Sequence, residues 1–123
     1  MDTDFRRQAQ QDMAKQLDAS LLPIRQAFLS TLIQRVIRFE ALKQDLEAGQ
    51  DMATALSGVA NLAHKMAGVA ETLGFGEIGI FAAEVDRAIT GGRIAGQGDT
   101  DIWHGIEDTL EQLLDAMEAQ LDD

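Results

Sequence analysis

Apolar residues in the first part of the chain recur at helical intervals, in two stretches that meet near Ser20 and Pro23. The first stretch predicts a short helix over about residues 3–18 with a thin apolar stripe, formed by Phe5, Ala9, Met13 and Leu17. The second stretch predicts a long helix that Ser20 can cap, that tolerates Pro23 in its first turn, and that ends near Gly49. Its apolar face consists of Ile24, Ala27, Phe28, Leu32, Val36, Phe39, Leu42 and Leu46.

Three further amphipathic helices follow, each bounded by residues that cap or break helices. Asp51 is the expected N-cap of the first, which ends at Gly74 and Gly76 and turns inward Leu56, Val59, Leu62, Ala63, Met66, Val69, Ala70 and Leu73. The next runs from about Glu77 to the pair Gly91-Gly92, and its inward residues are Ile78, Phe81, Ala82, Val85 and Ile89. After a loop over residues 93–98, the last helix opens at Asp99 or Asp101, with an apolar side made of Ile102, Trp103, Ile106, Leu110, Leu113, Leu114, Met117 and Leu121.

Four substantial helices joined by short connections predict antiparallel neighbours. The expected fold is therefore all-α, an antiparallel up-and-down four-helix bundle over about residues 20–121 with an additional N-terminal helix lying against it. The chain of 123 residues is long enough for one domain with a real core and too short for two of ordinary size. We therefore expect a single domain over residues 1–123.

The net charge of −11 narrows the range of partners. From Asp101 to the C-terminus the chain has eight acidic residues and no Lys or Arg. Such a surface repels nucleic-acid phosphates and anionic lipids, so we expect neither nucleic acid nor a membrane as a partner. There is no cysteine, which excludes disulfides and thiolate chemistry, and no leader-like or membrane-length apolar segment, so a cytoplasmic protein is expected.

His64 is the residue with the clearest chemical potential, because it falls on the outer side of its predicted helix. At about 100° per residue it lies about 160° from Met66, the centre of the apolar arc, so its imidazole should face solvent. The residues around it on that surface are small, namely Ala60, Asn61, Ala67 and Gly68. A solvent-facing helical Gly costs about 0.5–1 kcal/mol against Ala, which suggests that another molecule approaches closely there.

An exposed imidazole can act as a nucleophile towards phosphorus. It is substantially neutral at pH 7, so a nitrogen lone pair is available, and phosphoryl transfer to nitrogen gives a readily donated phosphoramidate. Such transfer depends mostly on positioning and charge stabilisation, and a rigid helix supplies the positioning. The plain alternative is a solvated surface histidine, which is the commoner state of a lone helical His.

The string Ala63-His64-Lys65-Met66-Ala67-Gly68, followed by Leu73-Gly74-Phe75, resembles the signature of histidine-containing phosphotransfer (HPt) domains. In that family the phospho-accepting His is followed by an apolar residue at +2 and by Gly at +4 and +10, and all three spacings match over about residues 60–80. The resemblance implies that His64 accepts a phosphoryl group from an aspartyl phosphate of a receiver domain and returns it to the same or another receiver. It also implies that the chain has no kinase activity and no cofactor of its own, since Mg²⁺ and the remaining catalytic groups come from the docked receiver.

The chain departs from the family pattern in one position near the phosphoryl group. The family usually has Lys at +3, where this chain has Ala67, while Lys65 stands at +1, about 100° around the helix from His64. Lys65 can either swing towards a phosphoryl group or merely solvate the side of the helix. The residues expected near the phosphoryl group or in partner docking are Asn61, Lys65, Ala67, Gly68 and Glu71. Arg87 and Arg93 are candidates for longer-range charge compensation.

Three other interpretations compete with phosphotransfer. The phospho-acceptor domain of a histidine kinase has an acidic residue after the His and a Pro shortly beyond, whereas Lys65 follows here and the only proline is Pro23. A metal or haem bundle needs several inward ligands, whereas His64 faces outward and His104 is a lone residue, so no metal is expected. A pseudo-HPt adaptor would bind a response regulator or kinase without being phosphorylated; the missing Lys favours it, and the intact His and Gly spacings disfavour it.

The sequence thus predicts an HPt protein of a multistep phosphorelay, with His64 as the phosphoryl-carrying nucleophile. Its expected partners are response-regulator receiver domains and hybrid sensor histidine kinases. We expect the protein to be a monomer.

Overall fold

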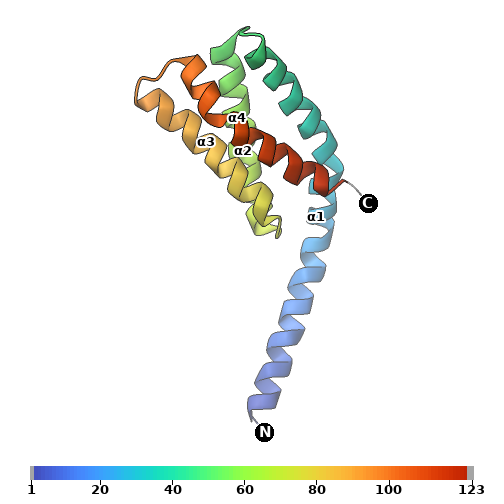
Figure 1. Cartoon of the computed structure of the whole chain (residues 1–123). Helices are drawn as coiled ribbons and strands as arrows, with labels where there is room; N and C mark the ends of the chain where they lie inside the picture. Colours follow the sequence, from blue (N-terminus) through green and yellow to red (C-terminus); the bar gives the residue numbers. More distant parts are fainter. Residues whose placement is uncertain (1, 122–123) are drawn as a thin grey trace.

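The computed structural model describes residues 2–121, without the side chains of residues 2, 3, 17 and 18. It has four helices, α1 (Asp2–Glu47), α2 (Met52–Thr72), α3 (Gly76–Ile94) and α4 (Asp99–Ala119), and no strand within the described residues. The upper half of α1 packs with the other three helices into a bundle, while its lower half extends away from them (Figure 1). The predicted all-α bundle is therefore confirmed. The predicted place of Leu17 on an apolar stripe, and residues 1, 122 and 123 of the expected domain, lie outside the described part.

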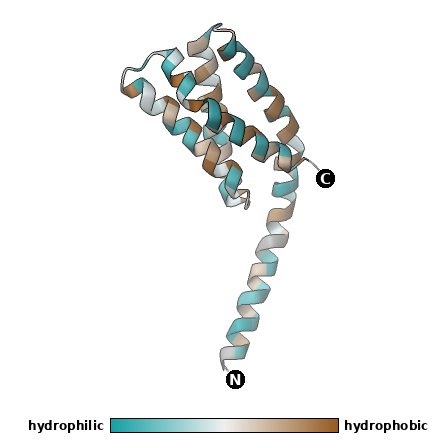
Figure 2. Ribbon diagram, viewed as in Figure 1, coloured by the Kyte–Doolittle hydropathy of each residue, from teal (hydrophilic) through white to brown (hydrophobic). Residues whose placement is uncertain are grey.

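The core lies where the apolar faces of the four helices meet, as Figure 2 shows by the hydrophobic segments gathered within the bundle. Its largest fully buried side chains are Phe39, Leu32, Leu46, Leu56, Met66, Ile78, Ile89, Ile106, Leu110, Leu113, Leu114 and Met117. Most residues predicted to face inward are buried or half-buried. Four are exposed instead: Ala27, Ile24, Val69 and Leu121. Ile24 and Val69 line an open groove between α1 and α2, which explains their exposure.

The predicted N-terminal helix is not a separate element, and it does not lie against the bundle. α1 is continuous from Asp2 to Glu47, with Ser20 and Pro23 inside it. An internal Pro costs one main-chain hydrogen bond, but the side chains before it at residues 19 and 20 are exposed, so water can reach the freed carbonyl. Leu21 and Thr72, the last residue of α2, both line the groove between α1 and α2, and the lower half of α1 extends beyond the other helices (Figure 1).

We call residues 4–16 the N-terminal arm. All of their side chains are exposed, including Phe5 at 78% and Met13 at 62%. The apolar stripe predicted there is therefore present on the helix but has no partner within the described part of the chain.

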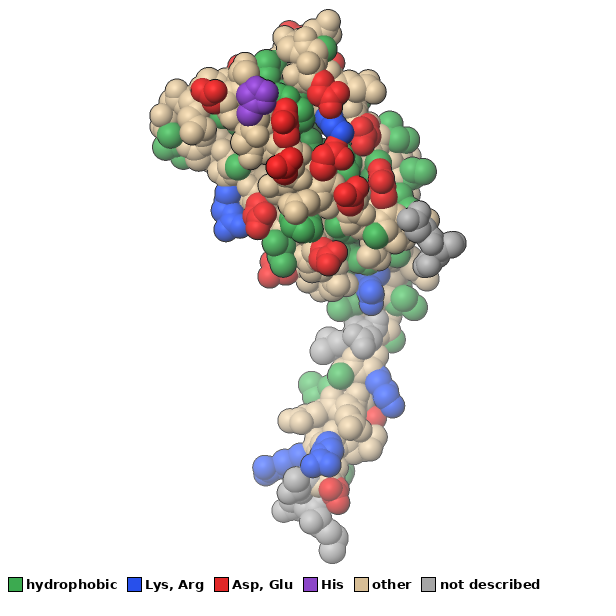
Figure 3. Space-filling view, in the orientation of Figure 1, with side chains coloured by type: hydrophobic (Ala, Val, Ile, Leu, Met, Phe, Trp, Pro, Cys, Tyr) green, Lys and Arg blue, Asp and Glu red, His purple; other side chains and the backbone are tan. Residues whose placement is uncertain are grey.

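Acidic side chains cover much of the bundle face seen in Figure 3, whereas several Lys and Arg side chains stand on the lower half of α1. Within the acidic region Lys43 of α1 donates a hydrogen bond to Glu111 of α4, and this bond raises the pKa of Lys43. Glu47 lies 3.9 Å from the same ammonium. The contact joins α1 to α4, but because both acidic partners are exposed it adds little to stability.

The pair Gly91-Gly92 does not end α3, contrary to the sequence expectation. The helix continues to Ile94, and the chain turns at Gly96, whose φ is +76°. Gly92 is buried, and a Cβ there would lie 2.8 Å from Cγ1 of Ile102 on α4. Gly92 therefore allows α3 and α4 to approach closely, and only Gly96 serves the turn.

Gly92→Ala is expected to lower the free energy of unfolding by about 1–3 kcal/mol, because the added methyl group overpacks the contact with Ile102. Gly91→Ala is the matched control: its Cβ would meet nothing within 4 Å, so it should raise stability by about 0.5–1 kcal/mol. Urea denaturation of both variants checks the pair. Equal changes in the free energy of unfolding for the two variants would show that the contact between α3 and α4 does not require a glycine at position 92.

Candidate functional site

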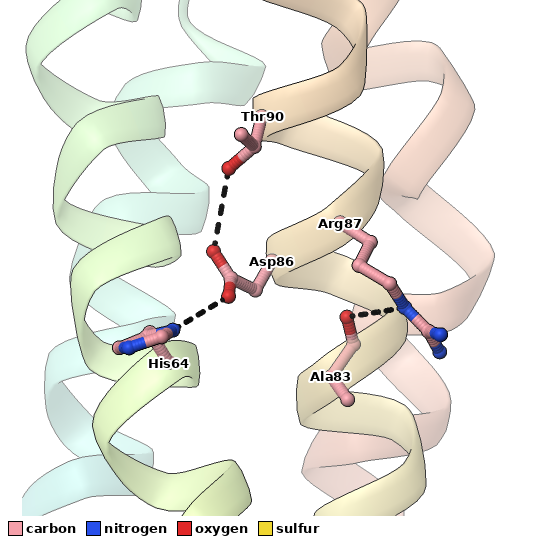
Figure 4. Close-up of polar contacts among 5 residues, drawn as sticks. All are labelled: His64, Ala83, Asp86, Arg87 and Thr90. Carbon is pink, nitrogen blue, oxygen red and sulfur yellow. Dashed lines mark hydrogen bonds and ion pairs between the residues drawn. The ribbon is translucent and has the colours of Figure 1, made fainter.

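His64 projects into solvent from the middle of α2, on the surface that α2 shares with α3 (Figure 4). Its side chain is 78% exposed. The outward orientation predicted from helical periodicity is thus confirmed, and neither burial nor a bulky neighbour on α2 limits access to the imidazole.

Asp86 of α3 holds one end of the imidazole. Nδ1 of His64 lies 2.8 Å from Oδ2 of Asp86, and the hydroxyl of Thr90 lies 3.5 Å from Oδ1 of the same carboxylate. An ionised carboxylate only accepts hydrogen bonds, so Nδ1 carries the hydrogen and Nε2 keeps the lone pair. Figure 4 shows the second ring nitrogen at the end of the ring remote from Asp86. The nucleophilic nitrogen is therefore the one that faces away from α3.

The close packing of α2 on α3 brings Asp86 to this position. A Cβ on Gly79 would lie 3.3 Å from the backbone nitrogen of Glu71, which is tighter than an ordinary contact, so the glycine favours this close approach. The two helices are antiparallel. Asp86 is seven residues after Gly79, and His64 is seven residues before Glu71. The register that places Gly79 against Glu71 therefore also places Asp86 against His64. Asp86 is not among the site residues predicted from the sequence, because helical periodicity within α3 carries no information on the register between helices.

The other predicted site residues surround His64 on the outer surface of α2. Asn61, Lys65, Gly68 and Glu71 are exposed, and Ala67 is half-buried. Among the described side chains, the polar contact of the His64 ring is with Asp86, and none joins it to Asn61. A Cβ on Gly68 would meet nothing within 4 Å. The chain itself therefore does not require a glycine there, and the surface beside His64 is open.

The basic residues near this surface lie on different sides of it. Lys65 lines the groove between α1 and α2, on the side of α2 away from Asp86. Arg87 lies with Glu71 along a depression between α2 and α3, and its Nε donates to the carbonyl of Ala83 at 3.3 Å. Arg93 donates to the carbonyl of Ala53 at 2.8 Å, in the first turn of α2 and far along that helix from His64. Of the basic residues that the sequence suggested for offsetting the charge of a phosphoryl group, only Lys65 and Arg87 therefore remain candidates.

His104 has a different environment from His64. It lies on α4, and its Nδ1 is 3.3 Å from Glu107 of the same helix.

Within the described residues no group of three or more His, Cys, Asp or Glu side chains could hold a metal ion. No helix there is both long and apolar enough to cross a membrane.

The fold and the site together define a class of protein, a helical bundle that presents, on the surface between α2 and α3, an exposed histidine with one free ring nitrogen. The Hpt domain family model matches residues 4–120, and the chain belongs to this family. No curated protein and no solved structure matches the chain. Membership indicates a phosphotransfer function in two-component signalling and interaction with the receiver domains and kinases of phosphorelays; domains of this family are phosphocarriers rather than enzymes.

Proposed function

We propose that this protein carries a phosphoryl group on Nε2 of His64 between receiver-domain aspartates in a multistep phosphorelay. The observation that supports this function is the exposed imidazole whose Nδ1 is bonded to Asp86 at 2.8 Å. Because that bond occupies Nδ1, the lone pair of Nε2 is directed to solvent, where an aspartyl phosphate can approach in line. In this proposal the protein is a cytoplasmic monomer without kinase activity, and its direct partners are response regulators and hybrid sensor kinases.

The docked receiver supplies Mg²⁺ and the groups that activate its own aspartate. This chain supplies the nucleophile and the surface around it, in which Asn61, Ala67, Gly68 and Glu71 contact the partner. Lys65 is the cation best placed to approach the phosphoryl group, since Nε2 faces away from α3 and Lys65 lies on that side of α2. In this chain Lys65 takes the part of the Lys that the family usually has in place of Ala67.

The experiment that tests the proposal is transfer of labelled phosphate from a panel of phosphorylated receiver domains to the full chain. We expect a label that is lost in acid and stable in alkali, and that maps to the peptide containing His64. A receiver that binds the protein but passes no phosphoryl group to it would support the adaptor function instead. Label on another residue would overturn the assignment of His64.

Gly68→Ala tests whether the glycine beside His64 serves the stability of the fold or the approach of a partner. Because the space beside Gly68 is open and the helix gains propensity, we expect the free energy of unfolding to rise by about 0.5–1 kcal/mol. The rate of transfer from a receiver should fall by about 10-fold, since a small displacement of the reacting atoms costs up to about 100-fold. Parallel urea denaturation and transfer assays check both effects. Unchanged transfer would show that no partner backbone approaches Gly68.

A further inference from the structure

We infer that the N-terminal arm is the surface through which two copies of this chain pair, as antiparallel helices that cross at Ala9. The inference does not depend on the proposed function, because the arm extends away from the bundle that carries His64 (Figure 1). Its starting point is an apolar stripe in water, since Phe5 is 78% and Met13 62% exposed. Within the described residues, the apolar side chains that lie in the core or pack against it begin only at Leu21.

The apolar stripe of the arm is symmetric about Ala9. Phe5 comes four residues before Ala9 and Met13 four residues after it, so at about 100° per residue they lie about 40° to either side of it. A two-fold axis at Ala9 therefore sets Phe5 of each copy opposite Met13 of the other, as in a closed dimer. The small side chain of Ala9 lets the helices approach where they cross, and a thioether against an aromatic ring is a favourable contact.

The distribution of charge favours the antiparallel direction. The arm carries three cations and two anions, whereas the whole chain has a net charge of −11, so the excess of negative charge lies outside the arm. Figure 3 shows this separation, with acidic side chains over the bundle and several Lys and Arg side chains on the lower half of α1. Parallel arms would place two acidic bundles at the same end, where they repel each other. Antiparallel arms place the bundles at opposite ends.

Lys15 and Asp4 fit the same register. They lie about 120° and 140° around the helix from Ala9, on the same flank of the stripe, six residues after Ala9 and five before it. A two-fold axis between antiparallel helices brings the same flank of both copies together, so Lys15 of each copy lies near Asp4 of the other. Exposed ion pairs of this kind add little affinity, but they favour this register over others.

The size of the surface makes the pairing weak. Residues 4–16 form about 20 Å of helix, which is small for a stable interface, so we expect a Kd of about 10–100 µM. At lower concentrations the chain remains the monomer of the proposed function. In the pair, the arm of the second copy lies along residues 4–16 and ends before the bundle. Both His64 surfaces therefore stay free, and pairing joins two carriers without changing either site.

The first test is sedimentation equilibrium of the full chain from about 5 µM to about 1 mM, a range that brackets this Kd. The apparent mass is expected to rise from 13.4 kDa towards twice that value. Ala9→Glu places two like charges at the crossing and should raise the Kd by at least about 10-fold. Ala14→Glu is the matched control, because Ala14 is also exposed but lies about 140° around the arm from Ala9. It should change the Kd by less than about twofold at about 0.15 M salt.

The second test determines the direction of the helices. The chain has no cysteine, so one introduced thiol reports one position. With oxidised glutathione as the oxidant, Ala9→Cys should form a disulfide-linked dimer, because the two thiols meet at the crossing. Gln16→Cys should not, since position 16 is seven residues from the axis and its two copies lie about 20 Å apart, beyond the Cα separation of about 4–7 Å that a disulfide allows.

Three results would overturn the inference. A mass of 13.4 kDa at every concentration would leave the arm to a different protein. A dimer that responds equally to Ala9→Glu and Ala14→Glu would not use this face of the arm. Equal disulfide formation at positions 9 and 16 would show parallel helices. None of these measurements involves a phosphoryl group, so each result leaves the test of His64 as the carrier unaffected.

Discussion

His64→Gln is expected to abolish acceptance of the phosphoryl group, with a fall in labelling of more than about 1,000-fold, while the fold and receiver binding remain. The amide nitrogen of Gln has no lone pair available for attack on phosphorus, but the side chain can still donate a hydrogen bond to Asp86. Because the His64 side chain is 78% exposed, its replacement removes no core contact and should change the free energy of unfolding by less than about 0.5 kcal/mol. Label transfer and a receiver-binding assay, made on the same preparation, measure both parts.

The other histidine gives the matched control for this substitution. His104 is also exposed and also lies close to a carboxylate, that of Glu107, but it is on α4 rather than on the surface between α2 and α3. His104→Gln should therefore accept phosphoryl groups as the unaltered protein does. Label retained in His64→Gln and lost in His104→Gln would reverse the assignment of the carrier.

Phe75→Ala is expected to lower the free energy of unfolding by about 3–5 kcal/mol, the largest effect on stability that we expect from a single site near the candidate surface. Phe75 is 7% exposed, and its ring stacks on that of Phe28 with centroids 5.1 Å apart. Arg25 covers Phe75 at 5.3 Å, and Arg35 covers Phe28 at 5.1 Å. These contacts fasten the turn between α2 and α3 to α1, so loss of the ring leaves a cavity and also releases that turn.

Phe75→Leu separates the aromatic contacts from burial alone. It keeps most of the apolar volume but loses the stacked pair, which adds about 0.5–1.5 kcal/mol beyond the buried area. We expect its effect in urea denaturation to be clearly smaller than that of Phe75→Ala. Equal losses for the two variants would show that the stacked geometry, rather than the filling of the core, carries the stability of this turn.

The features that the sequence predicted correctly depend on local periodicity. The four bundle helices, the burial of Met66 and the outward direction of His64 follow from the 3.6-residue repeat within one helix. The openness around Gly68 follows in the same way, because the residues one turn from His64 are small. No contact between helices is needed to obtain any of these.

The features that the sequence did not predict depend on how helices pair. Asp86 could be found only from the register of α3 on α2, which Gly79 helps to set. Gly92 was expected to end a helix, whereas α3 continues through it to Ile94. Its lack of a side chain instead allows α3 to pack closely on Ile102 of α4. Pro23 was expected to begin a helix, but it lies inside α1. Gly and Pro have more than one use in helical proteins, and tertiary packing decides between them.

The N-terminal arm and the bundle share one helix but not one core, and this has a consequence for cooperativity. Opening of the arm breaks main-chain hydrogen bonds without exposing buried apolar groups, and an isolated helix of this length is marginal in water. The bundle, in contrast, can open only by exposing the apolar residues that its four helices bury together. One continuous helix therefore spans two folding units with different free energies of opening, and the boundary between them lies near Leu21, which lines the groove between α1 and α2.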